Sequence, residues 1–233
     1  VNTNQSDMDT VGQVTRHVFG RSPEHGGSGS TAPATAAGVF HAIRASLGEA
    51  FGDDALAGRS VLVQGVGEVG RRLVELLTAA HARVLVSDVD EARVEEVCQR
   101  WGCVPVAVGS ALTTECDVFS PCALGGVLTA ETIPALRCRV VAGAANNQLG
   151  TDGDAELFAP RGILYAPDYV ANAGGVLHGL CREAMGWTES QVDLRLEAIA
   201  GTLAGIFHVA TARGISTERA AGELVAARLA AAH

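Results

Sequence analysis

One short segment constrains this chain more than any other, a predicted strand–turn–helix unit that carries three spaced glycines. Ser60–Gln64 is a short apolar run, residues 65–70 read G-x-G-x-x-G, and residues 71–77 have helical periodicity. In this context the first glycine permits a tight turn, the second lets a pyrophosphate approach the backbone, and the third lets helix and strand pack closely. The free N–H groups at the helix start attract phosphate. The sequence therefore predicts a dinucleotide-binding turn made of Gly65, Val66, Gly67, Glu68, Val69 and Gly70.

An acidic residue follows at the distance that such a turn requires. Arg83–Ser87 reads as the second strand, and Asp88 stands at its end. This is close to the roughly 20-residue offset at which a carboxylate receives the ribose hydroxyls of a dinucleotide. A 2′-phosphate would meet Asp88, Asp90 and Glu91, with no basic residue directly after the strand. We therefore expect the cofactor to be NAD rather than NADP.

Apolar strands alternate with helical stretches through most of the chain, which predicts a parallel sheet with helices on both faces. The expected fold is α/β, a Rossmann-type doubly wound parallel sheet. The strands are expected at residues 60–64, 83–87, 104–108, 118–119, 140–142 and 163–165. The clearest helices are expected at residues 33–51, 69–81, 91–101, 173–185, 189–213 and 217–231. We divide the chain into residues 1–31, a nucleotide-binding domain over 32–172, and a helical segment over 173–233.

Composition excludes several classes of function. A net charge of −9 disfavours nucleic acid, and no apolar run has the ~18 residues of a membrane span. The six cysteines form no C-x-x-C pair and the histidines show no ligand spacing, so we expect free thiols, no metal and a cytoplasmic location. All 17 basic residues are Arg. Chemistry that needs a lysine amine therefore cannot run on this polypeptide alone.

Longer blocks resemble the glutamate/leucine/phenylalanine/valine dehydrogenase family, especially the branch that acts on hydrophobic amino acids. They are residues 7–9, 26–29, 65–70, 116–126, 142–149 and 165–175. The resemblance implies the C-terminal, NAD-binding portion of an enzyme that deaminates a hydrophobic L-amino acid oxidatively to its 2-oxo acid and ammonia. It also implies a homo-oligomer for the complete protein.

The resemblance assigns roles to individual residues. Asn147 matches the residue that holds the substrate carboxylate, and Asn146 lies beside the cofactor. Asn172 matches the residue that hydrogen-bonds the nicotinamide carboxamide, Thr35 a threonine near the nicotinamide, and Ala123 part of a cofactor-contacting loop. Without these matches, paired asparagines would read as a turn, because Asn tolerates left-handed backbone conformations.

No residue of this chain is assigned a catalytic role. The family's catalytic lysine and aspartate are expected upstream of Val1, in a substrate domain toward which the C-terminal helices return. The resemblance also implies that residues 1–31 are a remnant of that domain and its hinge. Asp7 and Asp9 read instead as charges that stabilise a helix N-terminus. The chain by itself is expected to be inactive.

The substrate side-chain pocket is expected at Val176 and Gly179, which lie one helical turn apart. Gly179 leaves room for a bulky group, and Phe19–Ser22 and Leu180–Trp187 are more similar to the phenylalanine-specific members. We therefore expect a phenylalanine-like substrate, with close helix packing as the other interpretation of Gly179.

Three hypotheses remain open about function. A leucine or valine dehydrogenase shares the family pattern. A non-catalytic dinucleotide-binding module would explain the absence of lysine, but it has no need of the substrate-binding asparagines. A hydroxy-acid dehydrogenase would need a catalytic histidine with an acidic partner in the late loops, and none is evident.

Overall fold

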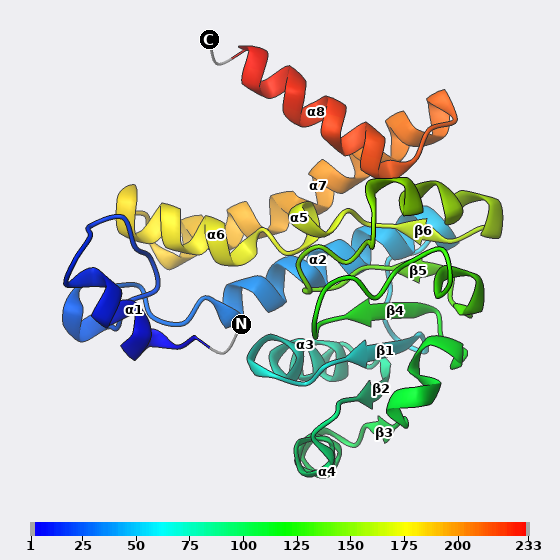
Figure 1. Ribbon diagram of the computed structural model, residues 1–233, viewed down its shortest axis with the longest axis horizontal. Helices are drawn as coiled ribbons and strands as arrows, with labels where there is room; N and C mark the ends of the chain where they lie inside the picture. Colours follow the sequence, from blue (N-terminus) through cyan, green and yellow to red (C-terminus); the bar gives the residue numbers. More distant parts are fainter. Residues whose placement is uncertain (1–2, 232–233) are drawn as a thin grey trace.

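The computed structural model describes residues 3–231 and has six parallel strands in the order β3-β2-β1-β4-β5-β6 (Figure 1). The strands are β1 (Ser60–Gln64), β2 (Arg83–Ser87), β3 (Val104–Pro105), β4 (Val118–Pro121), β5 (Val140–Val141) and β6 (Leu164–Tyr165). The α-helices are α1 (Gln5–Gly12), α2 (Ala32–Phe51), α3 (Glu68–Ala79), α4 (Glu91–Trp101), α5 (Asp168–Ala171), α6 (Gly174–Gly179), α7 (Glu189–Arg213) and α8 (Thr217–Ala231). This strand order is that of the doubly wound dinucleotide-binding fold, so the predicted fold class is confirmed.

The central strand β1 decides where a ligand can bind. It pairs with β2 on one side and β4 on the other, both in parallel register. The chain order reverses between these two neighbours, which opens a crevice at the carboxyl ends of β1 and β4. Val61, Leu62 and Val63 are fully buried, as expected for a strand covered on both faces.

Two apolar clusters cover the two faces of the sheet. Val61 and Val63 pack into the larger cluster, which contains the buried sides of α2, α3 and α7. Leu62 points to the other face, where a smaller cluster forms around Phe119 and Tyr165. Because side chains alternate along a strand, one five-residue strand anchors both clusters. Helix α2 packs against α3, α6 and α7, and these helices run beside one another in Figure 1.

Two predicted elements differ most from the structure. The strand expected over 104–108 ends at Pro105, and a 3-10 turn follows at Val108–Thr113. Proline lacks an N–H group and weakens the ladder there. The helix expected over 173–185 divides into α6 and a π-helical turn at Leu180–Ala184. Such turns insert an extra residue and are frequent at functional sites.

The N-terminal segment lies beyond the end of the sheet, beside α6 (Figure 1). Glu183 of the π-helical turn fastens it there. Its Oε1 accepts hydrogen bonds from the backbone N–H groups of Gly20 and Ser28, each at 2.9 Å, and from Ser28 Oγ at 2.6 Å. Burial opposes the charge on this carboxyl, but these bonds outweigh it and hold the pKa of Glu183 below its usual value. The π-helical turn after α6 thus contacts the N-terminal segment at residues 20 and 28, while the predicted domain boundaries remain predictions.

All six cysteines are free thiols, as predicted. Cys103, Cys116, Cys138 and Cys181 are buried, and the other two are half-buried. Burial raises the pKa of Cys116 and of Cys138 to about 12. These thiols therefore stay protonated and behave as small apolar side chains.

Over residues 3–231, no single helix is both long and apolar enough to cross a membrane. Helices α7 and α8 pass that test only as a pair, across a 114° bend. Within the same part of the chain, no three His, Cys, Asp or Glu side chains gather in a metal-binding group.

Glu218, in the first turn of α8, should make stability fall as the pH rises. Burial raises its pKa above the ordinary 4.5, and the neighbouring Asp168 carboxylate raises it further. The folded state therefore keeps this proton to higher pH than the unfolded state, so its contribution is present below pH ~4.5 and is lost as the pH passes the folded pKa. Glu218→Gln should match the wild type at acidic pH and exceed it at pH 8 in urea denaturation.

Glu223 on the same helix is the matched control, because its pKa is shifted the other way. Hydrogen bonds and ion pairs with Arg213 and Arg219 lower the pKa of Glu223. Its contribution is therefore present at neutral pH and lost on acidification, and Glu223→Gln should weaken the fold at pH 8. Equal effects of the two substitutions at pH 8 would contradict the role given to Glu218.

Candidate dinucleotide-binding site

The glycine-rich turn has the close contacts that its sequence predicts. Gly65 has a φ of +95°, which favours glycine, and its N–H donates to the Ser87 carbonyl at 2.7 Å. A Cβ at Gly65 would lie 2.7 Å from the backbone nitrogen of Ala123, so Ala123 packs directly over the turn. A Cβ at Gly70 would overlap the Gly65 carbonyl oxygen. Two of the three glycines are therefore required by the protein's own packing.

The remaining glycine of the motif, Gly67, faces open space. A Cβ at Gly67 would have no neighbour within 4 Å, and α3 begins at the next residue. A cavity of about 550 Å³ borders this helix start, lined by Ser30–Ala32, Glu68–Val69 and Thr3–Ser6. An open backbone at the N-terminus of a twelve-residue helix is suited to bind a phosphate group.

Asp88 lies at the carboxyl end of β2, as predicted, and it also organises the turn. Its side chain is 9% exposed, and its two oxygens accept the N–H groups of Val66 at 2.8 Å and of Asp90 at 3.0 Å. A second cavity, of about 560 Å³, borders Asp88 and is lined by residues 105–108 and one side of α4.

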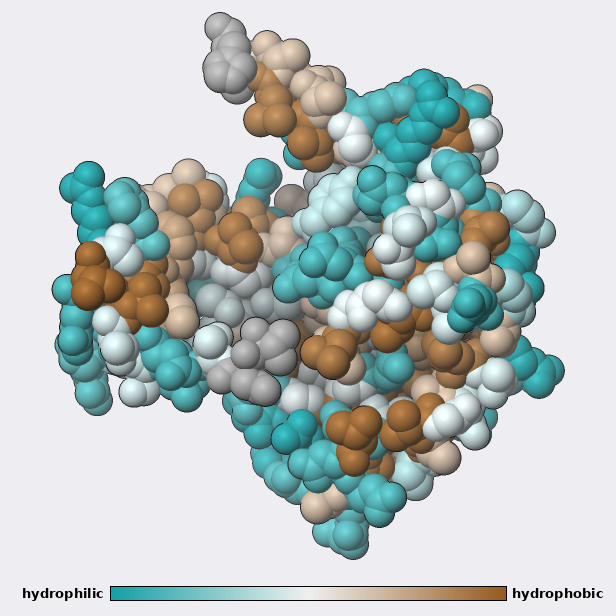
Figure 2. All heavy atoms as spheres, in the orientation of Figure 1, coloured by the Kyte–Doolittle hydropathy of each residue, from teal (hydrophilic) through white to brown (hydrophobic). Residues whose placement is uncertain are grey.

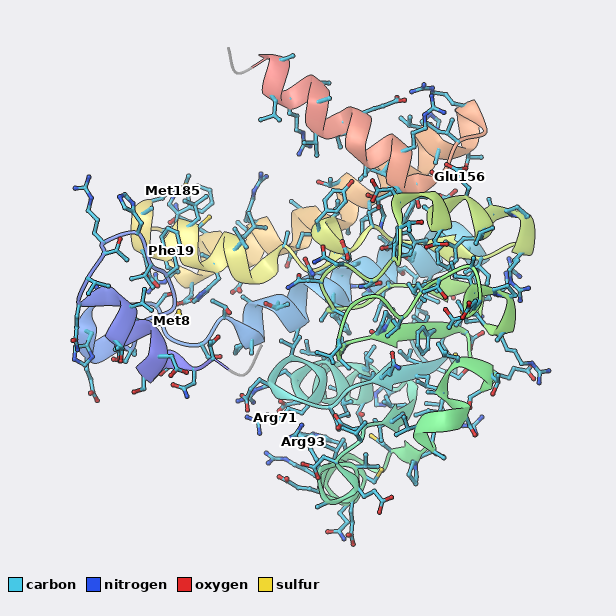
Figure 3. The ribbon with its side chains drawn as sticks, in the orientation of Figure 1. Met8, Phe19, Arg71, Arg93, Glu156 and Met185 are labelled. Carbon is cyan, nitrogen blue, oxygen red and sulfur yellow. The ribbon has the colours of Figure 1, made fainter. Side chains whose placement is uncertain are left out.

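Arg93 is the basic neighbour that the sequence did not reveal. It is not adjacent to the strand, but the first turn of α4 places its guanidinium 3.9 Å from the Asp88 carboxylate and 3.3 Å from Asp90. Figure 3 shows Arg93 and Arg71 where α4 and α3 begin. Arg93 therefore partly neutralises the negative charges of Asp88 and Asp90.

The structure brings two of the three predicted asparagines into contact. Asn172 Nδ2 donates to Asn146 Oδ1 at 2.7 Å and to the Ala144 carbonyl at 3.2 Å. Asn147 is exposed and has a φ of +51°, the left-handed conformation of a tight turn. A Cβ at Gly125 would overlap the Asn146 carbonyl oxygen, so the loop that follows Ala123 packs on this turn.

Thr35 lies at the same edge. A Cβ at Gly175 would come 2.5 Å from Thr35 Oγ1, so Thr35 in α2 packs against the turn that follows Asn172. Its hydroxyl donates to the Thr31 carbonyl at 3.0 Å. A continuous set of contacts thus runs along the carboxyl edge of the sheet: Gly65 with Ala123, Gly125 with Asn146, Asn146 with Asn172, and Gly175 with Thr35.

The two residues expected to line a substrate pocket have different surroundings. Val176 is 76% exposed, whereas Gly179 is buried against Phe19. A Cβ at Gly179 would lie 3.1 Å from the Phe19 Cβ. The expectation that Gly179 leaves free room is therefore corrected, because Phe19 fills that space. Its part in substrate binding remains a prediction.

Phe19 belongs to an apolar surface on the N-terminal segment and the α6 region. Figure 3 shows it between Met8 and Met185, and Figure 2 shows apolar residues on this lobe beside an indentation of the surface. Its exposed apolar side chains are Val11, Val14, Phe19, Val176, Leu180 and Met185. We call these six residues the apolar end.

Comparison with known proteins agrees with this architecture. The profile of the family Glutamate/Leucine/Phenylalanine/Valine dehydrogenase matches residues 26–97 and 86–233. From Thermoactinomyces intermedius, a leucine dehydrogenase is 39% identical over 229 residues and a phenylalanine dehydrogenase is 40% identical over 229 residues. These matches cover 98% and 97% of this chain.

The crystal structure of L-tryptophan dehydrogenase from Nostoc punctiforme superposes with a TM-score of 0.82 at 39% identity, covering 84% of this chain and 60% of that one. This chain spans 62% of the length of the two Thermoactinomyces relatives. The two sequence identities, 39% and 40%, do not distinguish between a leucine and a phenylalanine dehydrogenase. The chain belongs to the glutamate/leucine/phenylalanine/valine dehydrogenase family.

Proposed function

We propose that this chain is the NAD-binding part of a dehydrogenase that oxidatively deaminates a hydrophobic L-amino acid. The observation that carries the proposal is the continuous row of predicted residues along the carboxyl edge of the sheet, from the glycine turn to the Asn146–Asn172 pair. Open α/β sheets bind ligands at this edge, beside the point where strand order reverses.

The residues fit a nicotinamide dinucleotide from end to end. The open Gly67 backbone and the start of α3 would hold the pyrophosphate, and Asp88 would accept the ribose hydroxyls beside the 560 Å³ cavity. Asn172 would donate to the nicotinamide carboxamide, with its orientation set by Asn146. Bound NAD supplies the hydride acceptor, and these residues hold it in place.

The substrate would lie between this edge and the apolar end. Asn147 is exposed and offers an amide that can bind a carboxylate. The side chains of the apolar end favour a substrate with a hydrophobic side chain, and we propose that a phenylalanine-like side chain is preferred. The lysine that the family resemblance assigns to proton transfer is absent from this chain, so that step would depend on residues outside it, and we expect the chain alone to be inactive.

Titration with NADH tests the proposal directly. The 233-residue chain should bind NADH with a dissociation constant in the micromolar range or weaker, because the dinucleotide site is complete but the substrate side is open. NADPH should bind more weakly than NADH, because Asp88 and Asp90 would repel a 2′-phosphate. No change in NADH fluorescence or calorimetric heat up to millimolar cofactor would refute the proposed site.

A second candidate is a dinucleotide-binding module without catalysis. It is consistent with the absence of lysine from this chain. The left-handed backbone of Asn147 does not distinguish the two candidates, because asparagine favours such a turn with or without a substrate. Binding of NADH without any amino-acid oxidation by the protein with its upstream sequence would favour the module.

Phe19 should control substrate size in the complete enzyme. Removing its ring in Phe19→Ala would expose the space against Gly179, and each additional buried methylene of substrate gains ~0.8 kcal/mol. We expect the ratio of kcat/KM for Phe over Val to rise about 10-fold. Gly179→Leu should instead collide with Phe19 and destabilise the fold by about 1–3 kcal/mol.

Leu229→Ala is the matched control, because Leu229 is an apolar residue that is 60% exposed and lies in α8, outside the apolar end. It should leave the Phe/Val ratio unchanged. If Phe19→Ala does the same, Phe19 only covers Gly179 and does not reach the substrate.

A further inference from the structure

We propose that Asp168 is a positioning residue for the nicotinamide end of the site; this rests on the proposed function. Asp168 is the first residue of α5 and is 8% exposed. Its Oδ2 accepts the backbone N–H of Gln148 at 2.8 Å, and its own carbonyl accepts the N–H of Asn172 at 2.8 Å. One residue therefore connects the turn that carries Asn146 and Asn147 to the segment that carries Asn172.

The turn held by this bond is a constrained one. Asn147 has a φ of +51°, which an L-residue adopts only at a cost, and Gln148 follows it directly. Gln148 is fully buried, and its side-chain amide donates to the carbonyls of Gly143 at 3.1 Å and Ala145 at 3.0 Å. These two bonds stay inside the turn, whereas the bond to Asp168 ties it to α5.

Loss of that bond should act on one half of the site. The Asn146–Asn172 contact spans the same two segments at 2.7 Å, so separating the segments would separate the two amides. The glycine turn is held independently, by Asp88 on Val66 and by the Ser87 carbonyl on Gly65. Asp168 should therefore affect recognition of the nicotinamide and leave recognition of the adenosine diphosphate part unchanged.

Paired titrations with NADH and ADP-ribose test this assignment. In Asp168→Ala the dissociation constant for NADH should rise about 10-fold, equivalent to ~1.4 kcal/mol and close to one hydrogen bond to a charged group. The dissociation constant for ADP-ribose, which lacks nicotinamide, should change less than about 2-fold, because binding of the adenosine diphosphate part does not depend on Asp168. Asp168→Asn should restore most of the NADH affinity, because its amide oxygen can still accept the Gln148 N–H.

Asp117→Ala is the matched control for a general loss of stability. Asp117 also binds the backbone of another segment, accepting from Ser60 N–H at 2.7 Å and Ser60 Oγ at 2.8 Å, but at the amino end of β1. It should destabilise the fold without changing the NADH/ADP-ribose ratio. An Asp168→Ala chain that loses both ligands equally, or keeps its NADH affinity, would overturn the assignment.

Amide exchange in the wild-type chain gives a second test that does not depend on a variant folding. NADH should slow exchange of the Gln148 amide, because the bound carboxamide would hold the two segments together, whereas ADP-ribose should not. Equal protection by both ligands, or none by NADH, would also overturn the assignment. If the wild type binds ADP-ribose but not NADH, the proposed nicotinamide site itself is wrong.

Discussion

Gly70→Ala should abolish detectable NADH binding and cost the fold about 3 kcal/mol or more. The added methyl group would overlap the carbonyl oxygen of Gly65, and both atoms belong to backbone that the sheet and α3 hold in place. Relief requires α3 to move away from β1, which withdraws the helix start from the phosphate position. Chemical denaturation and NADH titration of the same preparation measure the two effects.

Gly222→Ala separates this collision from the general effect of alanine in a helix. Gly222 lies in α8, where an added Cβ would meet nothing within 4 Å. Because alanine is more favourable than glycine inside a helix by ~1 kcal/mol, this variant should be slightly more stable than the wild type and bind NADH normally. A Gly70→Ala chain that also binds normally would show that α3 tolerates displacement.

Asp88→Asn should move cofactor preference toward NADPH by about 10- to 100-fold in the ratio of dissociation constants. The amide can still accept the Val66 N–H, so the turn keeps its shape, while the charge that would repel a 2′-phosphate is removed. Arg93, 3.9 Å from Asp88, would then be left with a smaller negative charge beside it and could attract the phosphate. Titration with NADH and NADPH in one buffer gives the ratio.

Asp90→Asn also removes one negative charge, from a residue two positions further along the chain. Asp90 caps α4 by accepting the Arg93 N–H at 3.1 Å and does not contact the glycine turn. It should change the ratio much less than Asp88→Asn. Equal shifts from both variants would mean that only the net charge of this corner matters, and an unchanged ratio in Asp88→Asn would remove Asp88 from cofactor selection.

The sequence predicts the first half of the fold almost residue by residue, because local signals there agree with tertiary packing. The strands at 60–64 and 83–87 and the helix at 91–101 have the predicted bounds. The two-residue strands β5 and β6 are harder to bound, because so short a ladder is defined by its neighbours. The π-helical turn has no periodic signature; it accompanies the bonds that Glu183 makes to residues 20 and 28.

The residues of the candidate site also divide into those that the sequence could predict and those that it could not. Motif spacing identifies Gly65–Gly70 and Asp88, because turn and strand lie close along the chain. Arg93, Asp168 and Phe19 act across gaps in sequence, and only folding brings them to Asp88, Gln148 and Gly179. The one available signal for Asp168 was an acidic residue three positions after the end of the strand expected at 163–165. Free volume at Gly179 could not be read from the glycine alone, since the residue that fills it lies about 160 positions earlier.

The packing of α2 on α7 has a consequence for how the chain acquires its structure. Helix α2 buries nine residues, and its most extensive helix partner is α7, which begins about 140 residues after α2 ends. Synthesis proceeds from the N-terminus, so the part of α2 that packs on α7 has no cover until most of the polypeptide has been made. The β1–α3–β2 unit, in contrast, is built from neighbouring segments and can assemble early. Folding should therefore start at the glycine turn and finish when α7 packs against α2.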